Sequence, residues 1–346
     1  MMPANVTCES PAAGAASGAA SPAAEVAVVG ASGYTGALLA ELLLRHPSLR
    51  LVAVSSDQLA GEPVRAHLPR LRSDLRFCRH DEVGGVDLAF VCSPHGQAAT
   101  VVKRLLDDGA RVVDLSADFR LPADVYREWY GEHPCPELTP GVYGLTELHR
   151  DEVATARLVA NPGCYPTAAL LALAPLRHLG PLDVVIDAKS GVSGAGKAAT
   201  ARTHFCSVDS DLVPYGVGSH RHTPEIELGL FPRRPSLTFV PHLAPLQRGI
   251  SETIYVRLEV LPTAGDLRAL YRDFYAGEPF IEVCEAPPEL KDVAGTNVCR
   301  IFPHVDERAG RVVLVSAIDN LMKGASGQAL QNANVMLGLP ETEGLV

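Results

Sequence analysis

The residue best suited to chemistry is a cysteine in a tight turn. Cys164 follows the short apolar segment 158–160 and the sequence Asn161-Pro162-Gly163, and it precedes the apolar run Ala168–Leu176. This pattern predicts strand, turn and helix, which places Cys164 at a helix N-terminus. The unpaired N–H groups and the positive end of the helix dipole favour a thiolate there, and the thiolate is the nucleophilic form. A buried structural cysteine is the alternative, but the position favours a nucleophile.

A histidine pair could supply the acid and base. The segment His220–His222 precedes a helix that we expect Thr223 to cap and Pro224 to begin. Either histidine could exchange a proton with Cys164, because imidazole titrates near neutral pH. We favour His220, which we expect to lie further out on the loop and to face the ligand crevice. Two histidines separated by one residue could instead bind a metal, but no further ligand lies nearby in the sequence, so we expect none.

A glycine-rich turn lies near the start of the chain. The apolar run Val26–Val29 leads into it, and leucines with helical spacing follow. Strand, glycine turn and helix is the arrangement in which backbone N–H groups hold the pyrophosphate of a dinucleotide. The alternative is a turn whose glycines serve packing alone. The candidate cofactor contacts in this turn are Gly30, Ser32, Gly33, Tyr34, Thr35 and Gly36.

The next strand carries mixed signals about the ribose. Leu51–Val54 ends in Ser55, Ser56 and Asp57, where the ribose of a bound dinucleotide would lie. An acidic residue there accepts from a 2′-hydroxyl and repels a 2′-phosphate, whereas serines can donate to the phosphate. This segment alone therefore fits either NAD or NADP.

The remaining first half predicts the fold class. Buried strands such as Leu88–Cys92 alternate with helical patterns, which predicts an α/β fold with a Rossmann-type doubly wound parallel sheet. The loops Ser93–Gly96 and Ser116–Arg120 follow strands and should open onto the ligand crevice. His95 and Asp118 in these loops fit a turn or capping role as well as a functional one.

The second half predicts another domain. The glycine-rich loop Lys189–Lys197 could contact a cofactor through Ser193 and Gly194, or could be a surface connection. Strand patterns then return, which predicts an α+β domain on a mixed or antiparallel sheet with one face available for subunit pairing. We therefore expect a flexible tail at 1–24, a dinucleotide-binding domain at 25–163 to which a helix at 321–338 returns, and a catalytic and oligomerisation domain at 164–320.

Composition limits the partners and the compartment. The formal net charge of −10 argues against nucleic acid or an anionic membrane as a partner. The 8 cysteines show no C-x-x-C spacing, which suits reduced thiols in a cytoplasm. Residues 1–24 contain no Lys or Arg and do not resemble a signal peptide. No apolar run is long enough to span a bilayer. We expect a soluble cytoplasmic protein with a small-molecule ligand.

Seven motifs occur in the order of a known family, and they cover the chain from Gly30 to about Leu337. The chain resembles the N-acetyl-γ-glutamyl-phosphate reductase family (type 1) of the aspartate-semialdehyde dehydrogenase superfamily. The matching motifs are Gly30–Gly36, Pro94–Gly96, Ser116–Arg120, Pro162–Thr167, Ser190–Gly196, His220–Glu225 and Asp319–Gly324.

The resemblance implies reduction of an acyl phosphate by NADP(H). It implies that Cys164 forms a thioester, that the His220–His222 segment is the source of the acid and base, that the cofactor lies on the first glycine turn, and that Asn320 lies near the nicotinamide. It further implies oligomerisation through the second domain, as a homodimer or homotetramer. Pro94 is a further cofactor candidate, and the candidates for the substrate carboxylate or phosphate are Arg120, Lys197 and Arg221.

One departure from the family concerns cofactor choice. Many members carry Arg soon after the second strand, where this chain has Asp57-Gln58. We therefore expect a preference for NADPH that is smaller than theirs. Related enzymes act on aminoadipyl or aspartyl phosphate, and the motifs do not fix the acyl chain length.

Other protein classes fit less well. A short-chain reductase needs Tyr with Lys four residues later, and a serine hydrolase needs G-x-S-x-G; neither occurs. A non-catalytic NADP-binding sensor in which Cys164 merely packs is the alternative from another class.

Overall fold

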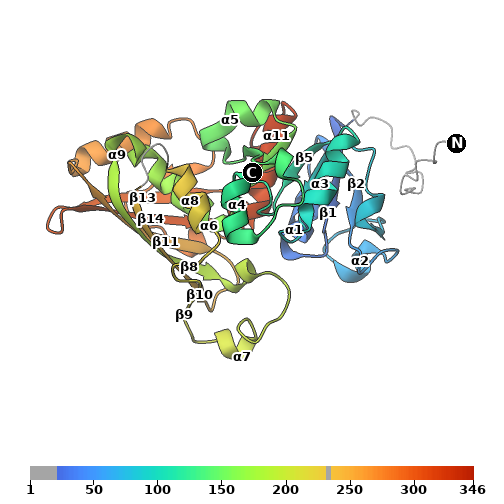
Figure 1. The fold of residues 1–346 in the computed structure, drawn as a ribbon, viewed down its shortest axis with the longest axis horizontal. Helices are drawn as coiled ribbons and strands as arrows, with labels where there is room; N and C mark the ends of the chain where they lie inside the picture. The colour runs from blue at the N-terminus through green and yellow to red at the C-terminus, as the bar shows by residue number, and fades with distance from the viewer. Residues whose placement is uncertain (1–21, 231–234) are drawn as a thin grey trace. The chain divides into compact units, whose positions relative to one another are not determined.

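The computed structural model describes residues 22–230 and 235–346, which form two compact units. The first unit runs to Asn161 and includes Gln328–Val346, and the second is Pro162–Gly327 (Figure 1). Most of the predicted flexible tail, residues 1–21, lies outside the described residues, and Ala24 at its predicted end already belongs to the first strand.

The described part of the first unit contains a seven-stranded sheet whose pairings are all parallel, in the order β3-β2-β1-β4-β5-β7-β6. This confirms the predicted doubly wound fold. The strands are β1 (Ala24–Val29), β2 (Leu49–Ser55), β3 (Phe77–Cys78), β4 (Leu88–Val91), β5 (Arg111–Asp114), β6 (Val142–Tyr143) and β7 (Leu158–Ala160). The helices are α1 (Tyr34–Leu43), α2 (Val64–His67), α3 (Ala98–Asp107), α4 (Ala123–Tyr130), α5 (Thr146–Thr155) and α11 (Gly327–Met336), with short turns η1 (His80–Glu82) and η2 (Pro136–Leu138).

The central strands of this sheet are buried because helices cover both faces of a parallel sheet. Every residue of β4 is fully buried, and α3 places Val102 and Leu105 in the same core cluster as Val91 of β4. The apolar runs that predicted these strands are therefore the core, and the loops at their carboxyl ends are left to bind ligands.

The second unit contains a mixed seven-stranded sheet, in the order β12-β13-β14-β11-β8-β10-β9 among the described residues. The strands are β8 (Pro181–Gly191), β9 (Val213–Pro214), β10 (Ser236–Ala244), β11 (Ile250–Leu258), β12 (Ile281–Val283), β13 (Cys299–Asp306) and β14 (Arg311–Ile318). The helical segments are α6 (Cys164–Leu173), α7 (Phe205–Val208), α8 (Thr223–Gly229), α9 (Ala264–Phe274) and α10 (Leu290–Val293), with η3 (Ala174–Leu179), η4 (Val192–Ala195) and the π-helical turn η5 (Met322–Ser326).

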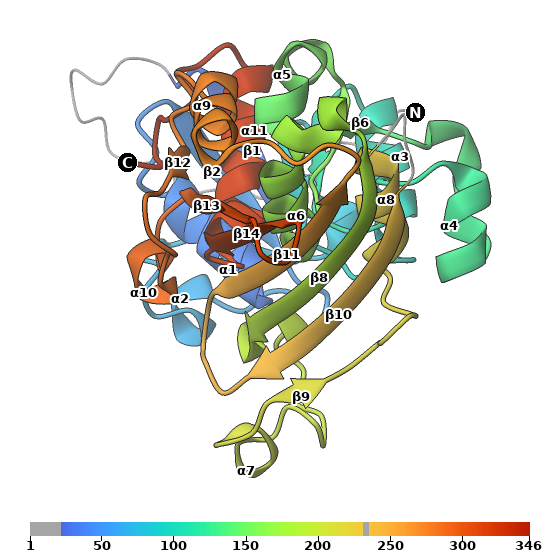
Figure 2. The ribbon, with the colours of Figure 1, turned by 90° about the vertical axis from the view of Figure 1, so that its left-hand side faces the viewer.

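The two faces of this second sheet differ. On one face Ile254 and Leu314 are buried, and Ser316 donates to the carbonyl of Ala168, so α6 covers this face. On the other face Asp187 and Tyr255 are half-buried. Figure 2 looks onto β8, β10 and β11, which lie side by side.

Helix α11 is held to the first unit by a buried polar network. The Asn332 amide donates to the Gly144 carbonyl (2.8 Å) and to Asn161 Oδ1 (3.0 Å), and Thr146 donates to Asn332 Oδ1 (2.7 Å). All of these groups are buried, so the network fixes the end of the segment that leads from β7 towards Cys164.

Candidate active site

Cys164 is the first residue of α6, directly after Gly163, whose backbone is extended (φ −67°, ψ 152°). The cysteine is half-buried, whereas the helix behind it, from Tyr165 onward, is buried. The positive end of the helix dipole therefore acts on a sulfur that solvent and substrate can reach, which suits a nucleophilic thiolate.

A buried carboxylate holds the turn before the nucleophile. Glu225 Oε1 accepts the backbone N–H of Gly163 at 2.8 Å, and Glu225 is only 3% exposed. Glu225 lies in the first turn of α8, directly after the His220–His222 segment. The segment that brings the histidines therefore also fixes the backbone next to Cys164.

Gly324 packs closely against Cys164. A Cβ atom on Gly324 would lie 2.8 Å from Cys164 Cβ, which is closer than real contacts allow. Gly324 belongs to the π-helical turn η5, a type of distortion that often occurs at functional sites. Only glycine fits here without displacing the cysteine.

The two histidines lie in an aromatic cluster. The His220 ring lies edge-on to Tyr165 (5.6 Å), Tyr215 (5.4 Å) and Phe239 (5.3 Å), and 4.9 Å from the His222 ring. His220 is therefore packed among rings rather than placed outermost on the loop, which corrects our reason for preferring it. Helix α8 begins at Thr223 with His222 as its N-cap, one residue earlier than predicted.

The environment of His220 keeps its ring neutral. Burial, reinforced by the charge of Arg221, lowers the pKa of His220 to about 4. His220 Nδ1 accepts the backbone N–H of His222 at 3.1 Å. In the neutral ring the proton is then on Nε2, so His220 can donate a hydrogen bond from Nε2 at neutral pH.

Two tyrosine hydroxyls lie close to the nucleophile. Tyr215 donates to the Tyr165 oxygen at 3.1 Å. Burial is the main cause that raises the pKa of both hydroxyls, Tyr215 to about 12, and the charge of a Cys164 thiolate contributes to both. Both phenols therefore remain protonated, and Tyr165 in turn donates its proton to the His242 carbonyl at 3.4 Å.

Asn320 braces two loops of the second unit. Its side-chain oxygen accepts the Gly249 N–H at 2.7 Å, and its amide donates to Ser193 Oγ at 3.0 Å. The predicted glycine-rich loop is shorter than expected, because β8 continues to Gly191. Lys189 in that strand pairs with Asp187 at 2.6 Å.

The first glycine turn fits a dinucleotide. Gly30 has φ +80°, and a Cβ on Gly36 would lie 2.4 Å from the Gly30 carbonyl oxygen, so both positions require glycine. At Gly33, the N-cap of α1, a Cβ would meet only the Gly30 oxygen at 3.8 Å. The helix N-terminus can therefore approach a pyrophosphate closely. Ser56 donates to Ser32 at 3.0 Å, which joins the turn to the end of β2.

Asp57, the acidic residue after the ribose strand, forms a hydrogen bond within the protein. Asp57 Oδ1 accepts the backbone N–H of His80 at 2.8 Å, and the His80 ring lies 2.8 Å from Ser55 Oγ. Asp57 therefore caps the turn η1. We based our expectation of a smaller NADPH preference on Asp57-Gln58 in place of an Arg, with the Asp57 carboxylate repelling a 2′-phosphate. The bond to His80 gives Asp57 a capping role, and the smaller preference stays a prediction.

Asp118 has a capping role. Its carboxylate accepts the N–H groups of Gly96 (2.7 Å) and Ala99 (3.2 Å) and the Tyr126 hydroxyl (2.9 Å). It therefore orders the loop that contains Pro94, which is exposed. His95 lies edge-on to Tyr130.

The predicted substrate-binding cations have different surroundings. Arg120 donates to the carbonyls of Asn161 (2.8 Å) and Leu115 (2.9 Å), so it holds the carboxyl ends of two strands of the first unit. Lys197 and Arg221 belong to the second unit and are exposed.

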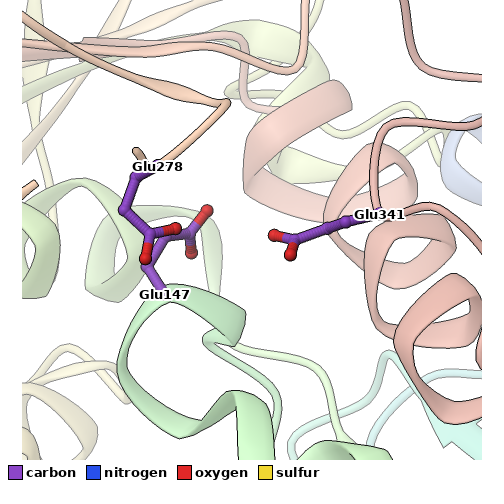
Figure 3. A group of neighbouring side chains, drawn as sticks. All are labelled: Glu147, Glu278 and Glu341. Atoms are coloured by element: carbon purple, nitrogen blue, oxygen red, sulfur yellow. The ribbon is translucent and has the colours of Figure 1, made fainter. Parts of the chain in front are cut away.

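Figure 3 draws three glutamates, of which Glu147 and Glu341 belong to the first unit and Glu278 to the second. Gln331 donates to both carboxylates of the first unit (2.9 and 2.7 Å), and Arg150 pairs with Glu341 at 2.9 Å. These carboxylates therefore serve to attach α11 to α5.

Several residues that contact Cys164, its turn or the histidines had no role predicted from the sequence. Glu225, Gly324 and Tyr165 are members of recognised motifs, and only their partners reveal what they do. Tyr215 and Phe239 lie outside every motif, and no pattern in the sequence indicates them.

Family models match both units of the chain. Residues 25–156 match the model "Semialdehyde dehydrogenase, NAD binding domain", and residues 164–320 match "Semialdehyde dehydrogenase, dimerisation domain".

Close relatives match nearly the whole chain. It is 48% identical to the N-acetyl-gamma-glutamyl-phosphate reductase of Dehalococcoides mccartyi, covering 92% of this chain and 96% of that one. It is 49% identical to the protein of that name from Geobacter metallireducens, with 92% and 97% covered.

The fold resembles that of solved structures at lower identity. Aspartate semialdehyde dehydrogenase II of Vibrio cholerae aligns with a TM-score of 0.72 at 17% identity, covering 91% of this chain and 98% of that one. The Candida albicans aspartate semialdehyde dehydrogenase with NADP aligns with a TM-score of 0.67 at 16% identity, covering 90% and 98%.

Proposed function

The chain belongs to the N-acetyl-gamma-glutamyl-phosphate reductase family of semialdehyde dehydrogenases, and on this premise we propose that it reduces N-acetyl-L-glutamyl 5-phosphate to N-acetyl-L-glutamate 5-semialdehyde with release of phosphate. NADPH is the reductant, and the reaction serves arginine biosynthesis. The observation that carries the proposal is Cys164 at the start of α6, in a turn fixed by Glu225, in a chain 48% identical to enzymes of that name.

Cys164 is the nucleophile. Its thiolate attacks the acyl carbon, the bond from that carbon to the phosphate oxygen breaks, and phosphate leaves with the electron pair. The product is a thioester, which is more readily reduced than a carboxylate. When bound, NADPH supplies the hydride that reduces this thioester to a thiohemiacetal.

The histidines manage charge and protons. His220, neutral and with its proton on Nε2, donates to the oxygen that gains negative charge as the acyl carbon becomes tetrahedral. His222, adjacent in the same cluster, is then the candidate base for the Cys164 thiol and for the collapse of the thiohemiacetal, which returns the thiolate and releases the aldehyde. Tyr165 and Tyr215 stay protonated, so they add no negative charge beside the Cys164 thiolate.

The cofactor lies on the glycine turn of the first unit. Gly33 exposes the N-terminus of α1 to the pyrophosphate, and Ser55 and Ser56 lie at the end of the ribose strand. The solved relative that contains NADP has the same fold, which supports NADP(H). Asn320 remains our candidate for the nicotinamide end, and Ser193 and Gly194 remain candidates for a further cofactor contact.

The substrate's anionic groups bind to exposed cations. Arg221 and Lys197 are the candidates, because a guanidinium and an ammonium pair well with carboxylate and phosphate. Arg120 is a weaker candidate, since it donates to two backbone carbonyls.

We also propose that the protein is a cytoplasmic homodimer or homotetramer. The second unit matches a dimerisation domain, and Asp187 and Tyr255 lie half-buried on one face of its sheet. None of the described cysteines forms a disulfide bond. No helix in the described part of the chain is long and apolar enough to cross a membrane. The small-molecule substrate and further copies of the chain are the partners we propose.

A substrate comparison tests the proposal. Purified protein is assayed for NADPH oxidation with N-acetylglutamyl phosphate, and with the aminoadipyl and aspartyl phosphates as alternatives. We expect the highest kcat/KM for the first. A higher value for either alternative would assign the chain to a related reductase. A different outcome is that the protein turns over none of the three substrates and that iodoacetamide alkylates Cys164 no faster than the other cysteines. That combined result would favour a non-catalytic NADP-binding sensor.

A further inference from the structure

A cavity of about 380 Å³ lies in the first unit beside the end of the ribose strand β2. Its lining includes Asp57, Arg79, His80, Ser93, Gln97 and Arg104. Arg79 directly follows β3, and Asp57 and Ser93 are the second residues after β2 and β4, so the cavity lies at the carboxyl edge of a parallel sheet, where such folds bind ligands.

The strand register places an arginine beside the ribose serines. Strand β3 pairs in parallel with β2, with Ser55 opposite Cys78, and the Ser56 N–H donates to the Cys78 carbonyl at 2.9 Å. Arg79 is the next residue, at the level of Ser56. The neighbouring strand thus supplies the positive charge that this chain lacks after β2 itself.

Asp81 also lines the cavity, as the exposed partner of Arg79, whereas Asp57 and Arg104 bond to backbone groups of the protein. Asp57 accepts the His80 N–H at 2.8 Å. Arg104 donates to the carbonyls of Val83 (2.6 Å) and His80 (2.9 Å). By contrast, the Arg79 side chain is 57% exposed and pairs only with exposed Asp81, at 3.2 Å, among the described residues. Such an exposed pair stabilises little and can be exchanged for a ligand.

A buried polar atom also indicates a ligand. Ser93 is 8% exposed, and its Oγ has no hydrogen-bond partner among the described residues. A buried hydroxyl without a partner costs free energy unless a ligand or water completes it.

We propose that Arg79 binds the 2′-phosphate of NADP(H) and sets the preference of this chain over NAD(H), with the adenosine in the adjoining cavity where Ser93 can bond to it. A guanidinium binds phosphate through two parallel N–H groups, whereas a ribose hydroxyl offers no charge to pair with. This inference rests on the proposed NADP(H) dependence and extends it to one residue.

The test uses ligands that isolate the phosphate. Binding of 2′,5′-ADP and of 5′-AMP is measured by calorimetry for wild type, Arg79→Gln, Arg79→Lys and Arg76→Gln. Arg76 precedes β3 and donates to the Gly61 carbonyl outside the cavity, so Arg76→Gln controls for the lost charge. The kcat/KM values for NADPH and NADH are compared in parallel.

We expect Arg79→Gln to weaken 2′,5′-ADP binding by about 10- to 100-fold, the scale of one charge-assisted hydrogen-bonding group, and to leave 5′-AMP within about twofold. Arg79→Lys should retain part of the preference, and Arg76→Gln should resemble wild type. Selective 2′,5′-ADP binding that Arg79→Gln does not reduce would overturn the assignment and leave the NADP(H) proposal intact. If the wild type binds 2′,5′-ADP and 5′-AMP equally well, both the Arg79 assignment and the NADP(H) proposal are overturned.

Discussion

Glu225 Oε1 accepts the backbone N–H of Gly163 at 2.8 Å, across 62 residues of sequence. This bond joins the helix that follows the histidines to the turn that precedes Cys164. Because Glu225 is buried, the bond is not exchanged with water. The turn before Cys164 and the segment that contains His220 and His222 are therefore joined through one buried side chain.

Replacement of Glu225 tests this coupling. Glu225→Gln keeps an acceptor oxygen for Gly163 and should leave kcat within about tenfold. Glu225→Ala leaves a buried N–H without a partner, which should lower the stability by about 1–3 kcal/mol. The turn before Cys164 also loses its anchor, so misplacement of the thiolate should lower kcat by about 10- to 100-fold. The rate of Cys164 alkylation by iodoacetamide should fall in the Ala variant alone. Equal effects of Gln and Ala on both measurements would show that the carboxylate charge, and not this bond, matters.

Gly324 should tolerate no side chain. Gly324→Ala would place Cβ 2.8 Å from Cys164 Cβ and push the nucleophile out of position, so we expect kcat to fall at least about tenfold. Gly265→Ala in α9 is the matched control, since its Cβ would meet only Thr263 Oγ1, at 3.8 Å. Wild-type kcat in Gly324→Ala would refute the close packing.

His220 should act as a neutral ring. Because its pKa is lowered to about 4, the ring stays neutral above about pH 5, and an inflection of kcat/KM near the ordinary pH of 6.5 should not arise from it. His220→Asn should lower kcat by roughly 10²–10⁴-fold. The unfolded state binds this proton more readily, so the contribution of His220 to stability is complete above about pH 6.5 and is lost as the pH falls towards 4.

The pH–rate profile of both histidine variants provides the check. An inflection near pH 6.5 that disappears in His220→Asn would show that His220 titrates as a base. An inflection that disappears only in His222→Asn supports the assignment of the base to His222.

Glu252 should make the folded protein less stable as the pH rises. Both carboxyl oxygens are buried without a hydrogen-bond partner among the described residues, and burial raises the pKa of Glu252 well above its usual range. The folded state therefore holds this proton more tightly than the unfolded state. The contribution of Glu252 to the free energy of unfolding is fully present below the unfolded pKa of about 4.3. It is lost as the pH rises, by about 1.4 kcal/mol per pH unit until the carboxyl group ionises in the folded protein.

The matched variant for this effect is Glu252→Gln, which keeps the shape and cannot ionise. Urea unfolding at several pH values should show that the variant gains stability relative to wild type as the pH rises. A constant difference between the two proteins would mean that Glu252 does not titrate in this way.

Local patterns predicted the fold class, and they predicted where Cys164 and the first glycine turn lie, because strand, turn and helix signals are carried by neighbouring residues. The confirmed fold class followed from those signals, and the confirmed family followed from the resemblance of seven motifs to a known family. Contacts between distant residues could not be predicted. From the sequence, Asp57 was expected to lie near the ribose. In the structure its carboxylate accepts the N–H of His80, 23 residues away, and caps a turn. Tyr215 lies beside His220 because β9 pairs with β10, and no short pattern indicates that pairing.

The most direct test of the account is acylation of Cys164 in the absence of cofactor. The enzyme is mixed with N-acetylglutamyl phosphate alone, and released phosphate and the intact protein mass are followed. We predict about one phosphate per active site in a burst, with an acyl adduct on the Cys164 peptide that disappears when NADPH is added, and neither burst nor adduct in Cys164→Ser. Phosphate release only in the presence of NADPH, or steady reductase activity in Cys164→Ser, would contradict the covalent mechanism.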